Sequence, residues 1–153
     1  MLIFKPFGRK KGYIMKSLEK VFKEYGHEKE YKADHTIAKV GTESNHMYYI
    51  ISGSVNVSKM VGKKKIIFAT FKAGDFFGEM SLISHKKHMS TMEVNEESTI
   101  LSLTQKKVEQ LLSENSDFAV GIVKGLIERL RKTDKYLIDA FSMAMEIDKA
   151  VKI

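Results

Sequence analysis

The sequence contains no cysteine and a single proline, and no apolar run approaches the length of a membrane span. Without cysteine the chain can form neither a disulfide framework nor a thiolate metal site, which fits a reducing compartment, so we predict a cytoplasmic location. The basic residues near the N-terminus are not followed by the apolar segment of a signal peptide. The sequence therefore predicts no membrane partner.

Motifs of catalysis are also missing. No nucleophile stands in a recognisable arrangement with a base, and there is no P-loop. His85 and His88 lie close in sequence but lack a carboxylate at the helical spacing of a metal site. We therefore predict that the protein is not an enzyme, with no catalytic residue, no metal ligand and no cofactor.

The net charge of +7, with a sequence pI near 9.4, permits attraction to nucleic acid. The basic residues are spread over the N-terminal segment, residues 63–65 and residues 86–87, and do not form a stripe along one helix. Lysine also far outnumbers arginine, which is the commoner direct reader of bases. We interpret the charge as a solvated surface and predict no direct DNA-binding element in this chain.

The chain of 153 residues, 43% hydrophobic and 29% charged, has the composition of one globular domain with an appended helix. Residues 1–12 hold the proline and a basic run, which predicts an irregular basic tail. Apolar residues then recur at spacings of three and four over residues 13–25, which predicts an amphipathic helix that ends at Gly26.

Several short strands are predicted between residues 28 and 104. Residues 47–51 form an apolar run rich in aromatic and β-branched side chains, typical of a buried strand that stops at Gly53. Residues 61–64 indicate a hairpin tip. Short strands with glycine turns between them predict a mainly β domain with flanking helices (α+β) over residues 13–115, built as a sandwich or barrel.

The last third is predicted to be helical. Thr104 is a suitable N-cap for a helix over residues 105–113, and Asn115 or Ser116 for a long helix over residues 116–153. In this long helix ten positions alternate at spacings of four and three, and all but one are apolar. We call them the seam: Ala119, Val123, Leu126, Leu130, Thr133, Leu137, Ala140, Ala144, Ile147 and Val151.

A seam of this length predicts a coiled coil, and therefore a homodimer through the C-terminal helix. At 1.5 Å per residue the helix would be about 50 Å long, too long to lie along a small β domain over its whole length. The alternative is that Ile122, Phe141 and Met145 form a second stripe that packs within the chain.

Two stretches carry a resemblance to a known family. The first is Ile37-x3-Gly41-Thr42-x4-Met47-Tyr48-Tyr49-Ile50-x2-Gly53, and the second is Gly74-Asp75-Phe76-Phe77-Gly78-Glu79-Met80-Ser81-Leu82. Their order and separation resemble the cyclic nucleotide-binding domain, in particular the effector domain of the catabolite activator protein family, over roughly residues 14–140. The resemblance implies a jelly-roll (double-stranded β-helix) β-roll with an N-terminal helix and a long C-terminal dimerisation helix.

The second stretch resembles the phosphate-binding cassette of this family, and we call residues 74–82 the cassette. By resemblance, Gly78 allows close approach of the backbone, Glu79 accepts a hydrogen bond from the ribose hydroxyl, and the amides near Met80 and Ser81 face the sugar-phosphate. By the same resemblance, Phe77 is expected to border the pocket. The implied ligand is cAMP or cGMP.

The chain departs from the family at two points. Ser44 stands where a glycine or another small apolar residue is usual. The arginine that clamps the phosphate in the family is replaced by Met89. Ser90 and Thr91 follow it, and their hydroxyls are predicted to donate to the phosphate without bringing a charge. A hydrogen bond to a charged group contributes about 1.5–3 kcal/mol, so its loss should weaken phosphate binding by about one to two orders of magnitude.

Three explanations of this departure stay open. A cation of the adjoining loop, Lys86 or Lys87, or else His88, replaces the arginine, because lysine binds phosphate as a point charge. Alternatively, the pocket binds a less anionic ligand with Met89 in its wall. In the third explanation the pocket is vestigial, and the domain is a dimerising scaffold.

Thr133 is the one polar residue of the seam. In the family, a hydroxyl residue at about this point of the long helix reaches the base of the nucleotide, so Thr133 is the predicted base-side lid. The family's transcription factors continue into a helix-turn-helix domain, whereas this sequence ends at Ile153. The prediction is a regulatory ligand-sensing module, with a ligand-free scaffold or a fragment of a transcription regulator as the alternatives.

Overall fold

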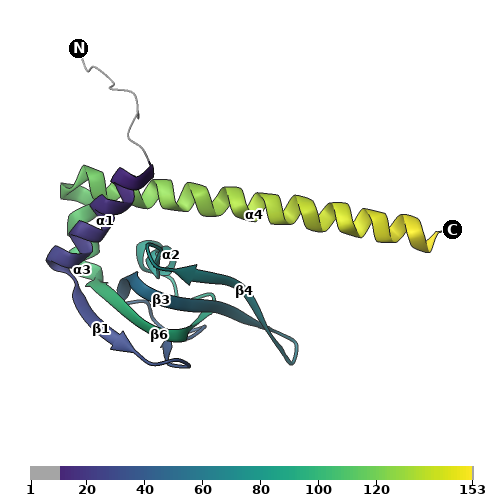
Figure 1. Ribbon diagram of the computed structural model, residues 1–153, viewed down its shortest axis with the longest axis horizontal. Coiled ribbons are helices and arrows are strands. Elements are labelled where there is room, and N and C mark those ends of the chain that lie inside the picture. The colour runs from purple at the N-terminus through teal and green to yellow at the C-terminus, as the bar shows by residue number, and fades with distance from the viewer. Residues whose placement is uncertain (1–10, 153) are drawn as a thin grey trace, which may run out of the picture.

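The computed structural model describes residues 11–152. Its elements are, in order, α1 (Lys11–Tyr25), β1 (His27–Tyr31), β2 (Thr36–Ala38), β3 (His46–Val61), β4 (Lys64–Lys72), β5 (Phe76–Phe77), α2 (Glu79–Ile83), β6 (Thr91–Thr104), α3 (Gln105–Glu114) and α4 (Ser116–Val151). The strands form a jelly-roll β-roll, the predicted fold, with α1, α3 and α4 packed at one end (Figure 1). The predicted tail lies outside the described residues up to position 10, and α1 begins at Lys11.

The antiparallel sheet has the order β1-β6-β3-β4, with β2 paired to β6 and β5 to β3. Its two central strands are longer than the sequence predicts, because β3 does not stop at Gly53. The backbone there has a φ of +91° and a Cβ would lie 2.0 Å from Ser98 Oγ, so only glycine fits. The pairing with β6 shifts register around this point, and the strand bends instead of ending.

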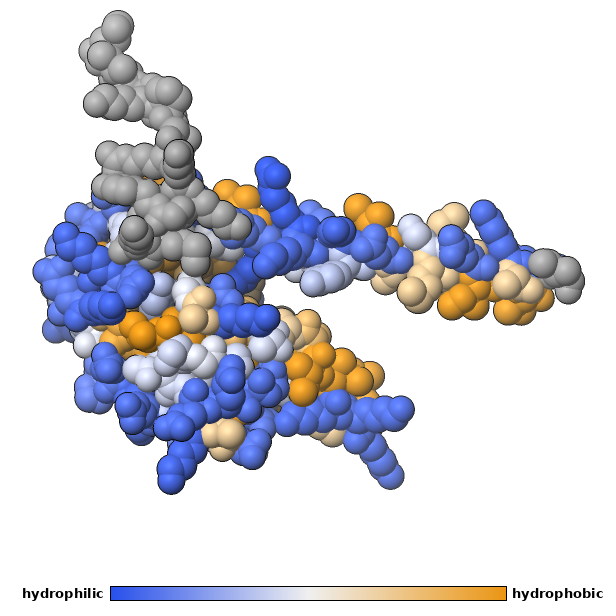
Figure 2. Space-filling model, in the orientation of Figure 1, coloured by the Kyte–Doolittle hydropathy of each residue, from blue (hydrophilic) through white to orange (hydrophobic). Residues whose placement is uncertain are grey.

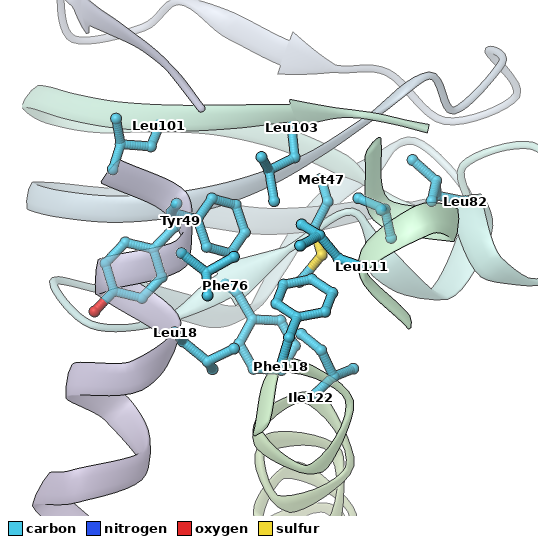
Figure 3. Packing of buried hydrophobic residues seen from close by; sticks show 13 residues of the cluster. Leu18, Met47, Tyr49, Phe76, Leu82, Leu101, Leu103, Leu111, Phe118 and Ile122 are labelled. Carbon is cyan, nitrogen blue, oxygen red and sulfur yellow. The ribbon is translucent and has the colours of Figure 1, made fainter. Parts of the chain in front are cut away.

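The main core lies between the sheet and the helices at its end (Figure 3). Phe22 of α1 stacks on Tyr49 of β3, with ring centroids 5.2 Å apart, and lies against Phe118 of α4 at 6.4 Å. A second core of Ile50, Val55, Phe77, Val94 and Ile100 fills the interior of the β-roll. Apolar side chains on alternate positions of β3 therefore supply both cores.

The two C-terminal helices begin where the sequence predicts. Thr104 Oγ1 accepts a hydrogen bond from the Lys107 amide, and Asn115 Oδ1 accepts one from the Phe118 amide. Asn115 is therefore the N-cap of α4, and the alternative, Ser116, is its first helical residue. Two glycines seat α4, since a Cβ at Gly121 or Gly125 would come within 3 Å of Leu18 or Phe76 respectively.

Beyond these contacts α4 continues past the β-roll as a single helix (Figure 1). Its seam residues Leu130, Leu137 and Ile147 are exposed in the single chain. The alternative stripe divides, because Ile122 is buried in the core whereas Phe141 and Met145 are exposed. Figure 2 shows apolar surface along the far part of α4 and over β4, which faces it.

Candidate functional site

A cavity of about 340 Å³ lies between the cassette, β4, the start of β6 and the middle of α4. Its volume is at the lower end of the range for small-molecule sites. From the cassette, the side chains or backbone of residues 77–81 form one wall. Phe68 and Phe71 of β4 and three residues of α4 form the opposite walls. The long helix therefore closes a site that begins in the β-roll.

The cassette is held in place by Gly78 and Ser44. Gly78 has a φ of +85°, and a Cβ would lie 2.9 Å from the His46 carbonyl oxygen, so a side chain is excluded on both counts. The hydroxyl of Ser44, which departs from the family pattern, is buried and donates to the Gly78 carbonyl at 3.4 Å. Glu79 then begins α2 directly after this turn.

Glu79 is the buried carboxylate of the site, with only 1% of the residue exposed. Arg129 Nη1 of α4 donates to Glu79 Oε1 at 2.5 Å. The other guanidinium nitrogen of Arg129 donates to the Phe76 carbonyl, and the guanidinium carbon lies 4.5 Å from the centroids of the Phe71 and Phe76 rings. The carboxylate is therefore paired with one arginine, which a backbone carbonyl and two aromatic rings also hold in place.

Two ionisable groups of the cavity have shifted pKa values. Burial raises the pKa of Glu79, and the charge and hydrogen bond of Arg129 oppose this shift. Burial lowers the pKa of His88, which therefore lines the cavity as a neutral imidazole at neutral pH. Asp75 Oδ2 accepts a hydrogen bond from the Lys72 amide across the turn before β5. His88 and the two carboxyl groups of the cavity wall, Asp75 and Glu79, therefore supply no positive charge that could bind an anion.

Most of the residues predicted from the sequence come together here. Phe77, Gly78, Glu79, Met80 and Ser81 line the cavity, and so do Met89 and Ser90 from the opposite end of the loop. Met89 is 67% exposed, so its side chain stands at the mouth of the cavity. The cavity wall at the arginine position is therefore an uncharged thioether.

Four predicted residues are not in the wall of the cavity in the single chain. Thr91 Oγ1 accepts a hydrogen bond from the Val40 amide. Lys86 and Lys87 are exposed on the loop after α2. Thr133 is exposed, and its hydroxyl donates to the Arg129 carbonyl one turn earlier at 2.9 Å. Their roles in ligand binding stay predictions.

α4 contributes three lining residues that were not predicted from the sequence: Arg129, Lys132 and Tyr136. These positions are spaced i, i+3 and i+7, which places them on one face of a helix. Each stands directly before a seam residue: Leu130, Thr133 or Leu137. Helical spacing from the predicted lid Thr133 would have found Arg129, four residues earlier, and Tyr136, three residues later.

Within residues 11–152, no group of three or more histidine or carboxylate side chains is placed to hold a metal ion. No helix in the same part of the chain combines the length and apolar character needed to cross a bilayer. The candidate site therefore consists of the cavity, the buried Glu79–Arg129 ion pair and the side chains that α4 contributes.

The family model of the cyclic nucleotide-binding domain matches residues 28–115. The cAMP-activated global transcriptional regulator CRP of Haemophilus influenzae is 30% identical over 111 residues, which cover 71% of this chain and 50% of that protein. Its counterpart in Pasteurella multocida is 29% identical over 116 residues, 74% of this chain and 56% of that protein. The chain thus spans about half the length of the curated relatives it matches.

Solved structures share the fold. The catabolite activator protein of Thermus thermophilus superposes with a TM-score of 0.69 at 23% identity, covering 79% of this chain and 57% of that one. The match to the family model itself extends across the cassette, residues 74–82.

Proposed function

Because the chain belongs to the cyclic nucleotide-binding domain family, we propose that it is a regulatory module that binds a cyclic nucleotide, cAMP or cGMP, with a weakened phosphate site. The observation that carries this proposal is the buried Glu79 carboxylate, which borders a cavity of about 340 Å³ directly after the positive-φ turn at Gly78. A carboxylate that is this buried costs free energy unless it is paired. Its place in the cavity wall, paired with Arg129, supports a binding role.

The geometry suggests how the two ends of a ligand are held. Glu79 lines the cavity and is paired with Arg129, so a ribose hydroxyl would donate to the Glu79 carboxylate. The phosphate would lie against the amides of Met80 and Ser81, which stand in the first turn of α2, where backbone N–H groups have no partner within the helix. Met89 at the mouth supplies no charge, so we expect affinity below that of a site with an arginine there.

A titration with a fluorescent cyclic nucleotide tests the proposal, with the wild type and Met89→Arg side by side. We expect weak but saturable binding by the wild type. Met89→Arg should bind about tenfold to a hundredfold more tightly, because it restores a charged hydrogen bond to the phosphate. Met60→Arg is the matched control, since Met60 is an exposed methionine near the β3–β4 tip, away from the cavity, and it should not change the affinity.

The outcomes separate the candidate functions. If the wild type fails to bind and Met89→Arg binds, the pocket is vestigial in the natural sequence. If neither binds cAMP or cGMP, the proposed function is wrong. If Met60→Arg tightens binding as much as Met89→Arg, the gain comes from net charge and not from the phosphate site.

The second candidate function is a dimerising scaffold that keeps the fold without the ligand. It is favoured by the exposed seam residues of α4, which a second copy of the chain would cover as a coiled coil. We propose that the homodimer forms in either case, and that it serves as the frame of the sensor in the first. A role as part of a transcription regulator, like that of the relatives named above, stays a proposal that gene length would test.

A further inference from the structure

Of the described charged side chains in the cavity wall, some have an ion-pair or hydrogen-bond partner, and one does not. Glu79 is paired with Arg129, and Asp75 accepts a backbone amide. Arg129 is held by Glu79, by the Phe76 carbonyl and by two aromatic rings. Among the cavity residues that the structure describes, Lys132 is the cation without an ion pair or a hydrogen bond. Its charge is therefore available to an anionic ligand.

The position of Lys132 follows from that of Arg129. Arg129 touches the first residue of α2, which fixes the height of α4 above the cassette. Lys132 stands three residues later, about 4.5 Å further along the helix at 1.5 Å per residue, and on the same face. Tyr136 follows one turn beyond, so both Lys132 and Tyr136 line the cavity. A flexible lysine stem at this point can turn back toward the cassette.

We propose that Lys132 supplies the positive charge that holds the ligand's phosphate, in place of the arginine that Met89 replaces. This inference rests on the proposed function. It moves the phosphate's cation from the loop after α2 to α4, the helix that carries the seam. Lys86 and Lys87 belong to that loop, but they do not line the cavity, whereas Lys132 does.

This placement lets the ligand connect the β-roll to α4. With the arginine in the loop, a phosphate would be held by the β-roll alone. With Lys132 as its partner, the phosphate contacts the amides of α2 on one side and Lys132 of α4 on the other, and so draws α4 toward the cassette. Arg129 is already paired with Glu79, so Lys132 is the cation of α4 that remains for a contact with the phosphate.

Calorimetric titration of cAMP into the purified full chain tests the inference. Lys132→Gln should weaken binding by about tenfold or more, because it removes a charged hydrogen bond to the phosphate. Lys135→Gln is the matched control, an exposed lysine one turn along α4 that does not line the cavity; it should change the affinity by no more than about twofold. Lys132→Arg should keep most of the affinity.

Two further measurements distinguish a phosphate contact from a structural effect. Adenosine, which has no phosphate, should bind Lys132→Gln and the wild type equally. In the Met89→Arg background, Lys132→Gln should cost no more than Lys135→Gln, because the arginine then holds the phosphate. Equal loss of adenosine and cAMP binding would show that Lys132 does not act on the phosphate.

The inference and the proposed function fail in different ways. If cAMP binds the wild type, and Lys132→Gln binds it as well as Lys135→Gln does, the proposed function stands and the role of Lys132 is wrong. If neither the wild type nor Met89→Arg binds cAMP or cGMP, the proposed function is wrong and the inference falls with it.

Discussion

Glu79 and Arg129, fifty positions apart in the sequence, are joined by a contact of 2.5 Å between Oε1 and Nη1. The pair ties the first residue of α2 to the middle of α4. It is the one ion pair described between the cassette and the long helix, and its two charges are unequally shielded, since the arginine side chain is 25% exposed and that of the glutamate 1%.

Removing the arginine should destabilise the fold. Arg129→Met leaves an unpaired carboxylate in a buried position, and breaking such a pair costs about 3–5 kcal/mol. Urea unfolding at neutral pH measures the loss. Arg131→Met, at an exposed position two residues along α4, should change the free energy of unfolding by no more than about 0.5 kcal/mol. Equal effects of the two substitutions would show that the Glu79–Arg129 pair does not stabilise the fold.

Stability should depend on pH through Glu79. Burial raises the folded-state pKa of this carboxyl above its ordinary value of 4.5, although Arg129 opposes the shift. The folded state therefore holds a proton that the unfolded state has already lost, and the free energy of unfolding falls as pH rises from about 4.5 to the folded pKa. The slope for one group is at most about 1.4 kcal/mol per pH unit.

Unfolding curves of the wild type and Glu79→Gln across this pH range isolate that dependence. The difference between the two free energies of unfolding, wild type minus variant, should decrease with rising pH. A difference that increases with pH would mean that Arg129 outweighs burial and that the folded pKa is lowered.

Gly78 and Gly41 offer a matched pair for the cassette turn. Their φ angles are +85° and +83°, but a Cβ would meet the His46 carbonyl oxygen at 2.9 Å in the first case and nothing within 4 Å in the second. Gly41→Ala should cost about 1–2 kcal/mol of backbone strain. Gly78→Ala should cost about 1 kcal/mol more, because it also overpacks. Equal losses in urea unfolding would contradict this steric reading of the turn.

The seam predicts a specific oligomeric state. Leu137→Asp should give a monomer by multi-angle light scattering at micromolar concentration, because a buried, unpaired carboxylate costs several kcal/mol at the interface. Ile138→Asp is the control, since Ile138 is exposed in the single chain, as Leu137 is, but lies outside the seam. A wild type that is itself monomeric would refute the coiled coil.

Local signals in the sequence predicted much of this fold. The helix caps Thr104 and Asn115 form as expected, because capping depends on a hydroxyl or amide within three residues of its partner. The strand ends were harder to predict. Gly53 carries the signal of a strand stop, yet β3 runs on, because β6 pairs with it on both sides of the bend. That pairing joins residues more than 30 positions apart, which no local pattern contains.

Some residues of the site can likewise be predicted from a local sequence pattern, whereas others depend on tertiary packing. The cassette is contiguous, so its residues could be named from the sequence. Helical spacing from Thr133 places Arg129 on the face of α4 that borders the site, but it does not identify Glu79 as its partner. That pairing depends on where α4 crosses the β-roll, which is set by the packing of Gly125 against Phe76. Ser44 shows the opposite case, because a departure from the family pattern proved to be a hydrogen bond to the Gly78 carbonyl.

The alternation of cavity and seam residues on α4 makes the helix sensitive to rotation about its own axis. Arg129 precedes Leu130, Lys132 precedes Thr133 and Tyr136 precedes Leu137, and consecutive residues of a helix point about 100° apart. The ligand and a second subunit would thus bind adjacent faces of the same helix. A rotation of α4 about its axis that improves its contact with the ligand would also change its contact with the second subunit. Ligand binding and dimer geometry would therefore be coupled through the rotation angle of α4.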